Sequence, residues 1–179
     1  MRVRKPTTPN QCPVCHQKGK SVQLITLKAL LKPTVLETIH PELSYAFCSN
    51  PSCEVVYFSD LQTFGKNMLN VSVFQKDDAL DVSVCYCFGW TRERLIQAVQ
   101  ENQHPIDHIR EQVQANRCGC EVNNPQGSCC LGNVTTFIRS LDKSQSLITS
   151  ICNNNYEKSL FYLLLTKHHQ VCLIIYSQL

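Results

Sequence analysis

Short alternations of hydrophobic and polar residues occupy the first sixty residues of the chain. They cover residues 21–24, 43–47 and 54–58. A period of two predicts strands that bury one face, and Thr26 is placed to cap a short helix that ends before Pro33. Two further alternating runs, at 71–74 and 81–84, predict additional strands. We therefore expect a small β-rich module in the first half of the chain.

The hydrophobic spacing changes to a helical period after residue 90. Thr91 is placed to cap a helix with one apolar face, and Pro105 both ends that helix and starts a second one. The second helix finishes before Gly119, so the two helices form a predicted helical hairpin. A third helix is expected from about Leu131 through Leu141. The predicted fold class is α+β, a β-rich module packed against this helical module.

Two short apolar runs, at 160–165 and 171–176, follow three asparagines at 153–155. Each run is shorter than the roughly 20 residues that a membrane-spanning helix needs. We expect no membrane span, and the pattern does not indicate what this tail does.

Twelve cysteines among 179 residues add a chemical constraint. The amino terminus shows neither an apolar run nor a cleavage-site pattern, so we expect no signal peptide and a cytoplasmic location. Reducing conditions there favour metal binding over disulfides.

Four of the cysteines lie on two tight turns of the β-rich module. They are Cys12, Cys15, Cys48 and Cys53. Each turn contains a proline and adjoins a strand, so it can aim two sulfurs at one point. Four thiolates with no further ligand are typical of a structural zinc ion. A redox-active Cys-x-x-Cys pair is the alternative, although such a pair usually follows a strand and opens a helix.

A second group of cysteines flanks the helical hairpin. Cys85 and Cys87 precede its first helix, and four more cysteines follow its second helix. The later four are Cys118, Cys120, Cys129 and Cys130. The hairpin can bring both sets to the same end, where four thiolates suit an iron–sulfur cluster. Spacing alone leaves open which two of the later four would be ligands.

The motifs in this region are more specific than any single cysteine pair. Residues 85–89 read Cys-Tyr-Cys-Phe-Gly, residues 118–121 read Cys-Gly-Cys-Glu, and residues 124–132 read Asn-Pro-Gln-Gly-Ser-Cys-Cys-Leu-Gly. Upstream stand Cys-Pro-Val-Cys at 12–15 and Val-Val-Tyr-Phe at 55–58. Over residues 8–140 the chain resembles the amino-terminal domain of CopZ-type copper chaperones.

This resemblance implies one zinc ion and one [2Fe–2S] cluster, in a domain whose second part is similar to bacterioferritin-associated ferredoxin. The cluster ligands that it implies are Cys85, Cys87, Cys120 and Cys130. It also implies electron transfer in copper handling, namely the reduction of Cu(II) to Cu(I) for a chaperone. The partner would be a copper ion, a copper carrier or a redox protein. The Met-x-Cys-x-x-Cys motif of the family's copper-carrier domain does not occur in this sequence.

These expectations divide the chain into three parts. Residues 8–80 form the zinc-binding module, residues 81–141 form the [2Fe–2S]-binding helical module, and residues 142–179 form a tail of unknown role.

Two other functions stay open at this stage. One is a ferredoxin-like partner in iron storage or iron–sulfur assembly, and the other is a structural or binding zinc protein with no redox role. We expect no conventional enzyme, because no nucleophile with a base, phosphate loop or acid pair stands out. The formal charge of +3 is scattered, so we expect no nucleic-acid partner.

Overall fold

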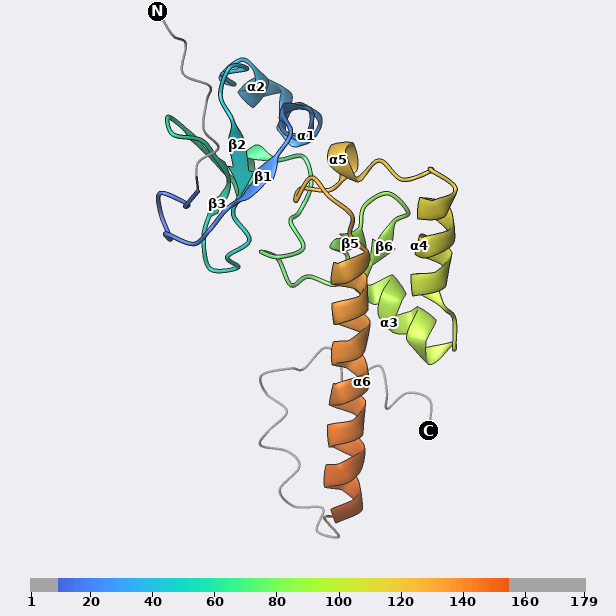
Figure 1. Cartoon of the computed structure of the whole chain (residues 1–179). Helices are drawn as coiled ribbons and strands as arrows, with labels where there is room; N and C mark the ends of the chain where they lie inside the picture. Colours follow the sequence, from blue (N-terminus) through green and yellow to red (C-terminus); the bar gives the residue numbers. More distant parts are fainter. Residues whose placement is uncertain (1–9, 155–179) are drawn as a thin grey trace, which may run out of the picture. The chain divides into compact units, whose positions relative to one another are not determined.

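A computed structural model describes the backbone of residues 10–154 and the side chains of residues 10–143 (Figure 1). The chain divides into two compact units at the junction between Arg139 and Ser140, inside the last helix. All of the predicted metal ligands belong to the first unit. That unit combines an antiparallel sheet with several helices, so the predicted α+β class is confirmed.

Four antiparallel strands form the sheet of the amino-terminal part, in the order β1-β2-β3-β4. They are β1 (Lys20–Val22), β2 (Tyr45–Phe47), β3 (Val55–Phe58) and β4 (Thr63–Gly65). The three strands expected from the early alternations are confirmed, and Ala46 pairs with both Ser21 and Phe58 in the middle of the sheet. Strand β4 is not among the strands predicted from the alternation.

Two short helices and a 3-10 turn cover this sheet. They are α1 (Leu24–Leu30), α2 (Pro33–Leu36) and η1 (Lys66–Met68). The predicted cap at Thr26 is wrong, because Gln23 takes the capping position and Thr26 lies fully buried inside α1. Aromatic and aliphatic side chains fill the core beneath, with Tyr45, Phe47 and Tyr57 at most 2% exposed.

The strand predicted at 71–74 is absent, because side chains rather than a neighbouring strand satisfy its backbone. The N–H of Phe74 donates to the hydroxyl of Tyr86 at 2.9 Å. The carbonyl of Phe74 accepts from the guanidinium of Arg92 at 2.7 Å. A turn then follows, in which the N–H of Lys76 donates to the carbonyl of Val73. The backbone groups of Phe74 are therefore not available to pair with a neighbouring strand.

The helical part begins with a hairpin and continues through four helices (Figure 1). Its elements are β5 (Ser83–Cys85), β6 (Trp90–Thr91), α3 (Arg92–Gln100), α4 (Pro105–Gln114), α5 (Cys120–Asn123) and α6 (Leu131–Asn154). The strand predicted at 81–84 corresponds to β5. Thr91 caps α3 as predicted, since its hydroxyl accepts from the N–H of Arg94 at 3.1 Å. Pro105 opens α4 as predicted.

Helix α6 begins at the predicted residue but runs well past Leu141, to Asn154. The apolar runs at 160–165 and 171–176 lie outside the described residues. Among the helices that are described, none has the length and apolarity needed to cross a bilayer.

Candidate metal centres

The first centre is built from two tight loops that carry a cysteine at each end. In the earlier loop, the N–H of Cys12 donates to the carbonyl of Gln17 and the N–H of His16 donates back to the carbonyl of Cys12, both at 2.9 Å. His16 takes a left-handed conformation with φ of 58°, which closes the turn. Its ring is exposed, in a position next to the ligand loop rather than within it.

The later loop, residues 48–53, joins β2 to β3. The N–H of Cys53 donates to the carbonyl of Asn50 at 3.2 Å, and the Asn50 side chain accepts from the N–H of Ser52 at 3.1 Å. The N–H of Cys48 donates to Val56 at 2.9 Å, which ties the start of the loop to β3. Neighbouring strands thereby hold both ends of this loop.

The two loops bring four sulfurs together. The Sγ atoms of Cys12, Cys15, Cys48 and Cys53 all lie within 4.8 Å of one another. The distance is 3.9 Å between Cys12 and Cys53, and 3.6 Å between Cys15 and Cys48. A tetrahedral zinc with bonds of about 2.3 Å separates its sulfurs by about 3.8 Å, so this arrangement fits one zinc ion.

The thiols of the first centre differ in pKa. Burial raises the pKa of Cys48 to about 12 and also raises that of Cys53. A hydrogen bond from the Gln17 backbone lowers the pKa of Cys15 to about 6. A divalent cation would neutralise the thiolates that such a dry site otherwise disfavours.

The second centre lies where the β5–β6 hairpin meets the loops before α5 and α6. Cys85 ends β5, Cys87 lies in the hairpin turn, and Cys120 is the first residue of α5. Cys130 directly precedes α6. The sequence-predicted set Cys85, Cys87, Cys120 and Cys130 therefore comes from three separate segments.

The structure brings these four thiols together as linked pairs. The Sγ atoms of Cys87 and Cys120 lie 3.7 Å apart. The thiol of Cys130 lies near enough to those of Cys85 and Cys120 to lower the pKa of both. Within the described part of the chain, the zinc-like set is the one group of three or more ligand side chains that fits inside 4.8 Å. The second set is therefore more extended than a site for a single tetrahedral ion.

The thiols of the second centre have pKa values shifted in opposite directions. The nearby thiol of Cys130 lowers the pKa of Cys120 to about 6 and also lowers that of Cys85. These two thiols raise the pKa of Cys130, whereas burial raises the pKa of Cys87 to about 11. The protons concentrate on part of the set, which leaves the other thiols ready to bind metal.

Two polar groups also point at the Cys87 sulfur. The backbone N–H of Gly119 lies 3.4 Å from this sulfur, and the side-chain amide of Asn123 lies 3.6 Å from it. Donors of this kind stabilise negative charge on a thiolate.

The two remaining cysteines of this region lie at its margin. Cys118 is half-buried and its thiol contacts that of Cys120, while Cys129 is exposed. By contrast, Cys120 is 5% and Cys130 1% exposed.

Sequence reasoning missed a buried polar residue beside the first centre. The ammonium group of Lys76 donates to the carbonyls of Asn50 and Cys53, at 2.7 and 2.9 Å. The side chain is only 8% exposed. Its sequence neighbours are polar and acidic, so the local pattern is typical of a solvated loop and gives no signal.

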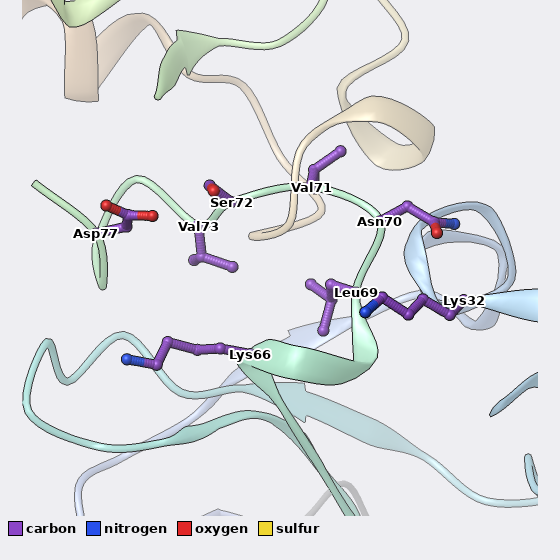
Figure 2. A pocket seen from close by; sticks show the side chains of 8 residues that line it. All are labelled: Lys32, Lys66, Leu69, Asn70, Val71, Ser72, Val73 and Asp77. Carbon is purple, nitrogen blue, oxygen red and sulfur yellow. The ribbon is translucent and has the colours of Figure 1, made fainter. Parts of the chain in front are cut away.

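A surface cavity of about 380 Å³ lies away from both centres (Figure 2). Its lining consists of Lys32, Lys66, Leu69, Asn70, Val71, Ser72, Val73 and Asp77. No cysteine lines it, and Lys66 is held by an ion pair with Glu54 at 3.1 Å.

Comparison with known proteins agrees with this geometry. The family model of the CopZ zinc binding domain matches residues 9–70, which contain the whole first centre. The X-ray structure of the Archaeoglobus fulgidus CopZ amino-terminal domain superposes with a TM-score of 0.61 at 30% identity, covering 70% of this chain and 95% of that structure. The chain belongs to the family of CopZ amino-terminal domains.

The full-length relative adds a limit to this assignment. The copper chaperone CopZ of Archaeoglobus fulgidus is 32% identical to this CopZ-family chain over 124 residues. The match covers 67% of the chain and 57% of the chaperone. The chain therefore spans little more than half the length of that relative.

Proposed function

We propose that this CopZ-family chain is a redox metalloprotein with two resident metal centres. A structural zinc ion is held by Cys12, Cys15, Cys48 and Cys53, and a [2Fe–2S] cluster is held by Cys85, Cys87, Cys120 and Cys130. The zinc module covers residues 8–80 and the cluster module residues 81–141, in the cytoplasm. Separate hydrophobic clusters support this division, with those around Tyr57 and Phe58 in the zinc module and that around Val84 mainly in the cluster module.

The observation that carries the redox proposal is the paired arrangement of the second set of thiols. A [2Fe–2S] cluster takes two thiolates on each of two irons. The Sγ atoms of Cys87 and Cys120 lie 3.7 Å apart. The thiol of Cys130 lies near enough to that of Cys85 to lower its pKa, so the four thiols can be divided into two such pairs. A second structural zinc would instead require four sulfurs about equally spaced.

The chain's own residues would suit this centre to electron transfer. When bound, the cluster supplies one electron at a time. The Gly119 N–H and the Asn123 amide stabilise charge at Cys87, and such donors raise the reduction potential. Burial of Cys85, Cys120 and Cys130 keeps water from most of the site.

The substrate that we propose is copper(II). The name of the Archaeoglobus relative and the family assignment support this choice. The reduced protein gives one electron to each copper(II) ion, which becomes copper(I), and the protein returns to its oxidised form. No proton or further reactant is needed for the balance. Copper(I) would then pass to a carrier protein or domain.

Metal analysis of anaerobically purified protein tests the centres directly. We expect about two irons and one zinc per chain, with a red-brown colour. A Cys87→Ser variant should lose iron and colour but keep zinc, and the exposed Cys129→Ser variant is the matched control that keeps both. Two zinc ions and no iron would overturn the redox proposal in favour of a structural zinc protein.

Copper reduction is tested by mixing dithionite-reduced, desalted protein with copper(II) under argon. We expect the oxidised spectrum to return and one copper(I) per chain to be trapped by a chelator. Protein that contains the cluster but does not react with copper(II) would contradict the copper role. It would favour a ferredoxin-like role in iron metabolism.

A further inference from the structure

The two cysteine centres are connected through a short segment that contributes no ligand to either. Residues 69–77 leave the sheet after η1 and run as an extended loop (Figure 2). Lys76 lies near the end of this loop, and its ammonium group binds the carbonyls of Asn50 and Cys53 in the second zinc loop. A single side chain thereby binds two carbonyls of the loop that carries Cys48 and Cys53.

The charge of Lys76 also requires an explanation. The side chain is 8% exposed, and none of the ion pairs among the described side chains includes it. A buried ammonium bound only by neutral carbonyls is unfavourable unless a negative charge lies nearby. Four thiolates around one zinc ion carry a net charge of −2, and Lys76 lies close enough to act electrostatically on Cys48.

The preceding residue reaches the other centre. The side-chain amide of Gln75 donates to the Oε1 atom of Gln126 at 2.8 Å. Gln126, which is 9% exposed, in turn donates from Nε2 to the carbonyl of Cys129 at 3.0 Å. That carbonyl belongs to the peptide bond leading into Cys130.

Every polar group of the Gln126 side chain is satisfied in this position. Its Oε1 accepts from Gln75 and from Asn133 in α6, and its Nε2 also donates to the carbonyl of Ser128 at 3.3 Å. A fully bonded amide in a nearly dry site holds the loop in one conformation. The loop and the beginning of α6 are therefore joined at Gln126.

The sheet and helix α1 also hold the second ligand loop, residues 120–130. Tyr57 of β3 is fully buried, and its hydroxyl donates to the carbonyl of Pro125 at 2.9 Å. Thr26 of α1 donates to the carbonyl of Glu121 at 2.6 Å. The zinc module thus contacts the second ligand loop at several points. Gln75 is one of them, and its neighbour Lys76 binds the zinc loop directly.

We propose that Gln75 and Lys76 are positioning residues that couple the two centres, so that zinc bound in the first centre stabilises the loop holding the cluster in the second. The sequence of contacts is Cys53 carbonyl, Lys76, Gln75, Gln126 and Cys129 carbonyl. Coupling between binding free energies is reciprocal, so an intact cluster also increases the affinity for zinc. The part of this inference that concerns the cluster rests on the proposed function. The part that concerns the conformation of the loop at 120–130 does not.

The test compares Gln75→Ala and Lys76→Met in the full chain, loaded with metal. In the Gln75→Ala variant we expect unchanged zinc content and cluster colour that fades about tenfold faster under an iron chelator. In Lys76→Met we expect faster loss of both metals. The matched controls are Lys66→Met, which removes an exposed ion pair, and Gln103→Ala, which removes an exposed amide. Both controls should behave as the unaltered chain.

A second readout does not need iron. Hydrogen exchange of the amides in residues 120–130 should accelerate in both variants, and in the unaltered chain when zinc is removed. The double variant should lose the cluster no faster than Lys76→Met alone, because both changes break one series of contacts. Exchange and cluster loss equal to those of the two controls would overturn the coupling. If the unaltered chain contained no iron, the proposed function would be wrong instead. The hydrogen-exchange data would still show whether zinc stabilises the loop at 120–130.

Discussion

At the scale of single residues, burial separates the thiols of the second centre into two kinds. Cys120 and Cys130 are nearly fully buried and act on each other's pKa, whereas Cys129 is exposed and Cys118 is half-buried. A buried thiol with thiol partners is pre-organised for a metal, because binding replaces a contact that already exists. The exposed thiol of Cys129 is not pre-organised in this way.

This difference predicts the outcome of four serine variants. Cys120→Ser and Cys130→Ser should lose nearly all of the iron, because each removes a sulfur from a pair. Cys118→Ser and Cys129→Ser should retain iron and the visible spectrum. Iron per chain, measured together with zinc, checks the result. Loss of iron in Cys118→Ser with retention in Cys120→Ser would show that the ligand moves along the Cys-Gly-Cys motif.

Residue types and spacing were sufficient to predict the groups that the structure brings together, but not their supports. Four zinc-site cysteines follow from two proline-containing turns beside strands. The choice among Cys118, Cys120, Cys129 and Cys130 needed the family resemblance, since all four suit the spacing. Lys76 could not be predicted, because its burial arises only when the loop at 69–77 folds back on residues 48–53.

At the scale of elements, the predictable parts are those whose own pattern determines their structure. The strands β1, β2 and β3 and the start of α3, α4 and α6 follow from alternation, capping and proline. The run at 71–74 has the same alternation but forms no strand, because Tyr86 and Arg92 take its backbone groups. Tertiary contacts of this kind are invisible to a local pattern.

Packing of the ligand loop against α1 gives a prediction for two glycines. Gly89 and Gly127 both have a φ of 62°, which disfavours any side chain by about 1–2 kcal/mol. A Cβ at Gly127 would also lie 3.1 Å from Val22 and 3.2 Å from Thr26, whereas at Gly89 the nearest such atom, in Arg94, is 3.8 Å away.

The Gly127→Ala variant should therefore lose more stability than Gly89→Ala. We expect a further loss of about 1–3 kcal/mol from overpacking between the ligand loop and β1 and α1. Chemical unfolding of the zinc-loaded protein measures both free energies of unfolding. Equal losses would mean that the loop at 120–130 moves away from α1 without cost, which would contradict the contacts at Thr26 and Tyr57.

At the scale of the whole molecule, both candidate centres and the three hydrophobic clusters of the described residues lie before Arg139. The similar CopZ amino-terminal domain covers 70% of the chain, a share comparable with this unit. Helix α6 nevertheless continues across the boundary to Asn154. The helix thus belongs to both units, and its first part contributes buried residues such as Val134 to the core around the second centre.

This division predicts that a chain ending at residue 139 binds zinc and iron in the same amounts as the full chain. The nine residues of α6 that remain include Val134, which is fully buried, and Phe137, whose ring packs edge-on against Phe74. A chain ending at residue 130 is the control. It removes both contacts and leaves Cys130 at a free end, so it should keep zinc and lose iron. Metal analysis and the visible spectrum distinguish the outcomes. Loss of iron from the longer chain would mean that residues beyond Arg139 are needed to hold the cluster, which would contradict the division at that residue.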